Sequence, residues 1–251
     1  MVTHGHCHPV QTDRLVAGAS PPRAVIASLT PGEASWWAPF SRQGTLVFAD
    51  VGWDDSGRWD LGRLDAIGSC YCFMPNAAEA QAYTGAETPA GAARQLGQLV
   101  ELAVVTEGGR GVTAFDAGTG ELAHVPALAV EAIDPTGAGD VFGAAFTTAS
   151  LQGWPLDQRL RFGVLAAALS VQQFGGSLAA PGWGDIADWW EATGRRAKRG
   201  EAAARKLALD YAFLDAVLPD GAATSTRRAT ATIARHSDAD NPPRKGQHET
   251  E

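Results

Sequence analysis

The stretch DPTGAGD (residues 134–140) decides the fold class of this 251-residue chain. It follows a strand-like segment and opens a helix in which Phe142, Ala145, Phe146 and Ala149 have the i, i+3, i+4, i+7 spacing of a buried stripe. Small residues let the backbone turn tightly, so that amide N–H groups and the positive end of the helix converge on one point. The pattern predicts an α/β protein with an anion-binding loop suited to a phosphate.

Asp140 stands in the first turn of that helix. A carboxylate at this position can take the proton from an attacking hydroxyl, while the neighbouring N–H groups stabilise charge on the phosphoryl oxygens. An ordinary glycine-rich turn capped by an aspartate also explains the letters GAGD, because Asp and Gly are favoured where helices begin. These residues alone leave both interpretations open.

Short apolar runs alternate with longer periodic segments before this loop. We expect strands at 24–28, 45–51, 70–73 and 102–106, with helical stretches at 77–84 and 89–99. That order predicts βαβ units and a mainly parallel sheet. The runs 112–116 and 122–125 flank a glycine-rich turn and predict a β-hairpin at one edge of the sheet. Helices from Gly139 to about Gly153 and from about 157 to 173 follow.

The charge is distributed unevenly around a formal net charge of -8. Residues 1–194 contain 9 arginines, no lysine and 20 acidic residues, whereas residues 195–251 contain 8 arginines, 3 lysines and 8 acidic residues. The absence of lysine from residues 1–194 excludes a Walker A lysine, a protein-kinase strand lysine and Schiff-base chemistry in this part of the chain. Its negative balance also argues against nucleic acid as its main ligand.

Composition also indicates the cellular location and the domain organisation. No apolar run approaches the roughly 18 residues of a membrane span, so we expect no membrane partner and, by default, a cytoplasmic location. The 3 cysteines do not form a disulfide framework. We expect a disordered leader at 1–20, one domain at 21–194, and a basic, weakly structured tail at 195–251 with one helix over 200–217.

Four motifs in order resemble the PfkB family of ribokinase-like carbohydrate kinases. DPTGAGD followed by VFGAAF (134–146) is similar to the family's C-terminal signature, and VTEGGRGV (105–112) is similar to its nucleotide-binding strand and turn. FMPNAAEA (73–80) resembles its Asn-x-x-Glu motif, and FADVGWD (48–54) resembles its central strand. The resemblance covers roughly residues 20–190. It implies a three-layer α/β/α fold with a mainly parallel central sheet.

The resemblance also implies an ATP-dependent enzyme that transfers the γ-phosphoryl group of MgATP to a sugar hydroxyl. The implied catalytic groups are Asp140 as the general base and the amides of Gly137, Ala138 and Gly139 as the anion hole. The implied cofactor site consists of Asn76 and Glu79 near the phosphates and Mg²⁺, and of Thr106, Gly108 and Gly111 around ATP. A monovalent cation such as K⁺ would take Asp134, Thr136 and carbonyl groups of residues 174–177.

Departures from the family define an alternative function. The resemblance implies that the family's N-terminal part, with its Gly-Gly sugar motif, early substrate aspartate and β lid, is missing, and no Gly-Gly-x-x-x-Asn pattern occurs between residues 1 and 50. Val164 stands where some members place an asparagine toward adenine. The alternative is therefore a truncated, non-catalytic nucleotide-binding remnant. A small-molecule sugar is the expected partner, with a homodimer as an open alternative.

Three other features have competing interpretations. His4, His6, Cys7 and His8 alternate as a Zn²⁺ or Ni²⁺ clip would, although a disordered terminus explains them as well. The tryptophan pairs at 36–37 and 189–190 suit either sugar stacking or packing in a core or interface. The basic cluster at 195–199 suits either an acidic partner or a solvated helix end.

Overall fold

The computed structural model describes residues 16, 18–30, 36–64, 66–225 and 227. The His and Cys residues at 4–8 and most of the expected leader lie outside this range. The described chain forms two compact units. The first unit contains the chain up to Ala129 together with Gly139–Ala168, and the second contains Val130–Ala138 and the chain from Leu169 onward.

A six-stranded sheet in chain order forms the centre of the first unit. Its strands are β1 (Ala24–Leu29), β2 (Leu46–Val51), β3 (Cys72–Phe73), β4 (Leu102–Thr106), β5 (Val112–Asp116) and β6 (Leu122–Val125). Strands β1 to β4 pair in parallel, while β5 and β6 add an antiparallel hairpin at the edge. The mainly parallel sheet, its strands and the edge hairpin were all predicted correctly.

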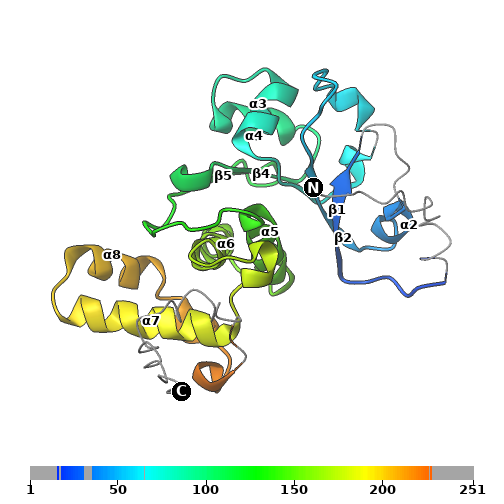
Figure 1. Ribbon diagram of the computed structural model, residues 1–251. Helices are drawn as coiled ribbons and strands as arrows, with labels where there is room; N and C mark the ends of the chain where they lie inside the picture. Colours follow the sequence, from blue (N-terminus) through cyan, green and yellow to red (C-terminus); the bar gives the residue numbers. More distant parts are fainter. Residues whose placement is uncertain (1–15, 17, 31–35, 65, 226, 228–251) are drawn as a thin grey trace, which may run out of the picture. The chain divides into compact units, whose positions relative to one another are not determined.

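Helices cover both faces of this sheet. Figure 1 shows α3 (Ala77–Thr84) and α4 (Pro89–Leu96) on one side of β4, and α5 (Ala138–Leu151) and α6 (Leu156–Ser170) on the other. Alternate residues of one strand therefore enter different cores. In β2, Val47 and Ala49 face the core of α3 and α4, whereas Phe48 faces the core of α5 and α6. This arrangement confirms the predicted α/β fold with a helical layer on each face.

Local sequence signals set the helix boundaries. Helix α3 begins at a capping box formed by Asn76 and Glu79 and ends at Gly85, which has a positive φ of 70°. Helix α4 begins after Thr88, whose hydroxyl accepts a hydrogen bond from Gly91 N, and has proline in its first turn. The short α2 (Ala38–Ser41) buries Phe40, and Trp37 before it is 2% exposed. The tryptophan pair at 36–37 therefore packs against the core.

The second unit is helical beyond residue 195, where the composition predicts weak structure. It contains α7 (Trp183–Lys198), α8 (Ala202–Asp210) and α9 (Leu214–Val217). Helix α7 runs through the expected boundary at 194/195, so weak structure was predicted to start too early. Alanine, arginine and lysine are strong helix formers, and two of the large apolar residues among them are fully buried, Tyr211 at 1% and Leu214 at 0% exposure.

Trp189 and Trp190 take part in the packing of this second unit. The Trp189 ring meets Tyr211 edge-on at 5.0 Å, and Trp190 Nε1 donates to Asp215 at 2.6 Å. Structural packing therefore accounts for both members of the pair.

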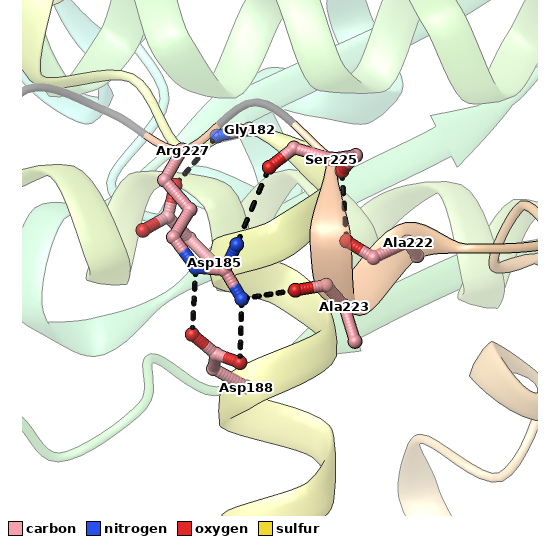
Figure 2. A network of polar contacts seen from close by, with 7 residues as sticks. All are labelled: Gly182, Asp185, Asp188, Ala222, Ala223, Ser225 and Arg227. Atoms are coloured by element: carbon pink, nitrogen blue, oxygen red, sulfur yellow. Dashed lines mark hydrogen bonds and ion pairs between the residues drawn. The ribbon is translucent and has the colours of Figure 1, made fainter.

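A polar network joins the end of the described chain to α7 (Figure 2). Arg227 donates from Nε and Nη2 to the two carboxylate oxygens of Asp188, each at 3.1 Å, and also to the carbonyls of Ala223 and Ser225. Its side chain lies over Gly184, where an added Cβ would come within 2.9 Å of Arg227 Cγ.

Among the described residues, no helix is long and apolar enough to cross a membrane.

Replacing Phe146 by alanine should severely destabilise the protein. Phe146 is 0% exposed and lies between the rings of Phe48 and Phe142. Removing a buried phenylalanine leaves a cavity that costs about 3–5 kcal/mol. The midpoint of urea unfolding measures the loss. Phe174→Ala is the control, because Phe174 is 64% exposed and its removal should change stability by less than about 0.5 kcal/mol. Equal losses in the two variants would contradict the described core.

Candidate active site

Polar residues gather where the parallel strands end in the first unit. Ser28 and Asp50 are register partners near the ends of β1 and β2. Asn76 follows β3 and forms an isolated parallel bridge with Thr106, the last residue of β4. The bridge is supported by a hydrogen bond from Thr106 N to Pro75 O at 3.1 Å. In open α/β sheets, ligands bind at this carboxyl edge of the strands.

The Asn76–Glu79 motif forms the start of α3. Asn76 Oδ1 accepts from Glu79 N at 3.1 Å, and Glu79 Oε2 accepts from Asn76 N at 2.9 Å. Glu79 is 7% exposed, and burial raises the pKa of its carboxyl group, opposed by the hydrogen bonds from Asn76. The motif thus fixes a mostly buried carboxylate at the carboxyl edge of the sheet.

Asp50 is the site group that the sequence analysis missed. The pKa of its carboxyl group is raised to about 6, first by burial and then by the negative charges of Asp140 and Glu79, while a hydrogen bond with Ser28 opposes these effects. These charge effects mean that Asp140 and Glu79 both lie near Asp50. The available signal was an aspartate inside LVFADV, because a strand buried on both faces is normally apolar to its end.

Asp140 is exposed in the first turn of α5. The following residues Val141, Phe142 and Phe146 are buried and hold this helix against the sheet. The structure therefore brings three predicted site residues, Asn76, Glu79 and Asp140, to the same edge of the sheet as Asp50.

In the second unit, the loop before α5 packs on the loop at 174–177. Asp134 accepts from Thr136 N at 3.0 Å and from Gly175 N at 3.3 Å. Hydrogen bonds from the Thr136 side chain and backbone lower the pKa of Asp134, with smaller contributions from Gly175 and Gly176. The predicted cation-binding groups are thus neighbours in space.

Gly137 cannot be replaced at this loop contact without movement of the backbone. It has a φ of 71°, and an added Cβ would lie 2.5 Å from Ser177 N. Ala138 N donates to Pro135 O at 3.2 Å, which closes the turn before the helix. The N–H groups of the first turn of α5 have no carbonyl partner within the helix and can serve an anion.

The third group of predicted residues is Thr106, at the end of β4, with Gly108 and Gly111 in the turn to β5. Gly111 has a φ of 111°, and an added Cβ would lie 2.1 Å from Val125 O. Glu107 braces the turn, because its N–H donates to Gly111 O at 2.8 Å and its carboxylate accepts from the Thr113 hydroxyl at 2.6 Å. These hydrogen bonds brace the turn, and Gly108 in it is exposed.

Among the residues that the structure describes, no group of three or more His, Cys, Asp or Glu could hold a metal ion by itself. The oxygen ligands at the carboxyl edge nevertheless suit Mg²⁺, which commonly binds through one or two carboxylates together with substrate phosphates and water.

Val164, which stands where the resemblance implies an asparagine toward adenine, is buried in the core of α5 and α6.

The chain is similar to known proteins over part of its length. The profile described as pfkB family carbohydrate kinase matches residues 35–182. The chain belongs to the PfkB family of carbohydrate kinases. It is 44% identical over 77 residues to ribokinase of Bacillus subtilis, covering 31% of this chain and 26% of the relative. It is 37% identical over 103 residues to cytidine kinase of Thermococcus kodakarensis, covering 41% and 37% respectively.

A solved PfkB-type structure shows the same fold. Ribokinase of Arabidopsis thaliana, solved with ribose and ATP, superposes with a TM-score of 0.50 at 31% identity and covers 57% of this chain and 47% of that chain. The PfkB chain described here therefore spans less than half the length of each of these three relatives.

Replacing Asp50 by asparagine should change how stability depends on pH. With the pKa at about 6 in the folded state against 3.8 as the ordinary value, the folded protein holds this proton to higher pH, so stability falls as pH rises from about 4 to 6. Asparagine cannot ionise and removes that fall. In metal-free buffer we expect Asp50→Asn to be more stable than wild type at pH 8 by about 1 kcal/mol, after allowance for solvent screening.

The difference between wild type and Asp50→Asn should vanish near pH 4, as measured by thermal unfolding across the pH range. Asp188→Asn is the control of opposite sign, because hydrogen bonds from Arg227 lower the pKa of Asp188. An Asp50→Asn variant that is less stable than wild type at pH 8 would contradict the proximity of the three carboxylates.

Proposed function

We propose that this PfkB-family chain is an ATP-dependent carbohydrate kinase that transfers the γ-phosphoryl group of MgATP to a hydroxyl group of a sugar. The observation that supports this best is Asp140 in the first turn of α5, directly after the Gly137–Gly139 loop and close in space to Asp50 and Glu79. The family match supports the reaction class.

In the proposed reaction, Asp140 accepts the proton of the acceptor hydroxyl. The hydroxyl oxygen forms a bond to the γ-phosphorus while the bond from that phosphorus to the β–γ bridging oxygen breaks, and ADP leaves. The N–H groups of Gly137, Ala138 and Gly139 stabilise the charge on the phosphoryl oxygens. The Ala138 N–H makes a long turn bond of 3.2 Å, which it can exchange for a stronger, charge-assisted bond to a phosphate oxygen.

The remaining residues hold the cofactor in this proposal. Mg²⁺, held through water by Glu79 and Asn76, would neutralise charge on the phosphates. Thr106, Gly108 and Gly111 line the nucleotide, since the turn leaves no bulky side chain at these glycines. Asp134 and Thr136, with carbonyls of residues 174–177, bind a monovalent cation such as K⁺ beside the loop.

A second candidate function is binding of MgATP without catalysis. The chain spans less than half of the three relatives compared above. A non-catalytic domain that binds MgATP, with the same nucleotide residues and no turnover, is consistent with that coverage.

Glu79→Gln should weaken Mg²⁺-dependent binding of ATP. Glutamine can still accept the hydrogen bond from Asn76 N that Glu79 accepts at 2.9 Å, so the helix cap is retained while the charge is lost. We expect about a tenfold weaker affinity, or about 1.4 kcal/mol, in titration calorimetry with MgATP. Glu87→Gln, at an exposed position just beyond α3, is the control and should bind as wild type does. The absence of any heat at millimolar MgATP in the wild type would refute both candidate functions.

Asp140→Asn should abolish turnover while retaining ATP. Loss of a general base lowers the rate by about a hundredfold or more, whereas nucleotide affinity in calorimetry should stay within about threefold, because the base acts in the transition state. Sugar-dependent ADP formation over a panel of pentoses, hexoses and nucleosides provides the assay. Undiminished turnover in Asp140→Asn would show that another group is the base, and MgATP binding without turnover in the wild type would favour the second candidate.

A further inference from the structure

Trp53 differs from the other tryptophans of the chain. The structure describes all 8 tryptophans, and Trp53 is the only exposed one, with 66% of its surface open. The other seven are buried or half-buried. Trp53 follows β2 by two residues and stands three residues after Asp50. A large aromatic surface is therefore left open next to the carboxyl edge of the sheet.

The ring of Trp53 packs against a second tryptophan, Trp59. It meets the Trp59 ring edge-on, with centroids 4.8 Å apart and an interplanar angle of 79°. Trp59 is the only non-glycine residue with a positive φ in the described chain, at 46°. Asp54 holds this conformation, because its Oδ2 accepts from Trp59 N at 2.9 Å and its Oδ1 accepts from Ser56 N at 2.9 Å. A strained conformation of this kind persists only where its surroundings fix it.

The aromatic row leads back to the carboxylates of the site. Trp59 contacts the Tyr83 ring edge-on at 5.1 Å. Tyr83 is buried on α3, one helical turn after Glu79. Burial raises the pKa of the Tyr83 hydroxyl, and the charges of Asp54 and Glu79 add to this effect, which places Tyr83 near both groups. The row Trp53–Trp59–Tyr83 thus connects the exposed indole to Glu79.

The charge around Trp53 restricts what can bind there. The segment 50–60 contains four aspartates and one arginine. Carboxylates accept hydrogen bonds from hydroxyl groups and repel anions. A ring that carries hydroxyls and no charge fits this surface, whereas a sugar acid or a phosphorylated sugar would meet repulsion.

We propose that Trp53 is a specificity-determining residue of the acceptor site, where its indole face stacks on the apolar C–H face of a neutral sugar ring whose hydroxyls meet the neighbouring carboxylates. This inference rests on the proposed kinase function and deepens it by naming the acceptor class. Stacking on the indole removes apolar surface of both rings from water. Trp59 and Tyr83 are positioning residues in this arrangement.

Two readouts on the full chain test the proposal, with D-ribose, D-glucose and D-glucuronate as probes. The first is acrylamide quenching of tryptophan fluorescence. We expect ribose or glucose to protect part of the tryptophan emission from quenching in the wild type. The control Trp154→Phe should show the same protection, because Trp154 is half-buried against Phe162. The protection should disappear in Trp53→Phe, which lacks the reporting indole.

The second readout is calorimetric affinity for the same sugars. Trp53→Phe keeps an aromatic face and should bind within about threefold of wild type, whereas Trp53→Ala should bind at least about tenfold more weakly. Three results would overturn the proposal: equal protection in Trp53→Phe, unchanged affinity in Trp53→Ala, or tighter binding of glucuronate than of the neutral sugars. Failure of every sugar to bind the wild type would overturn it as well. A titration with MgATP on the same preparations shows separately whether the nucleotide part of the proposed function stands.

Discussion

Burial of β2, β3 and β4 on both faces is the constraint that puts the polar groups of this protein at the strand ends. Residues of β2 alternate between two cores, with Val47 and Ala49 on one side and Phe48 on the other, all 0% exposed. Polar side chains cannot stand along such strands without losing solvation. They occur instead where strands end, and because β1 to β4 run parallel, these ends share one edge. Asp50, Asn76 and Thr106 are found at that edge.

The same constraint shapes the electrostatics of the site. Asp50 and Glu79 are both drawn partly out of solvent, and burial raises the pKa of each carboxyl group. A carboxylate-rich edge repels phosphates unless cations and oriented N–H groups compensate for the charge. The first unit lacks lysine altogether, so the compensation we propose comes from Mg²⁺ and the backbone amides at the start of α5. At Gly111 and Gly137 other backbone atoms come too close for a side chain, which keeps the backbone at these turns free of bulky groups.

Sequence patterns predicted the fold closely where period and turn chemistry agree. The strands, the edge hairpin and helices α3 to α6 were predicted because apolar spacing, capping residues and glycines point to the same boundaries. Composition misled the prediction beyond Arg195, where alanine and arginine were interpreted as weak structure although they favour a helix and Tyr211 and Leu214 are buried against it. Asn76, Glu79 and Asp140 could be chosen from motifs, because their roles depend on local spacing. Asp50 and Trp53 could not be chosen from motifs, because their importance comes from residues far away in the chain. For Asp50 the distant neighbour is Asp140, and for Trp53 it is Tyr83, which supports the aromatic row.

We propose that backbone amides at the start of α5 bind the transferred phosphoryl group. Hydrogen–deuterium exchange of a peptide covering residues 134–142, with and without MgATP, tests it most directly. We expect exchange of the amides at 137–139 to slow when MgATP binds, while exchange in a peptide from α8 (Ala202–Asp210) stays unchanged. Nucleotide binding seen by calorimetry with no slowing of exchange at 137–139 would contradict this role of the amides.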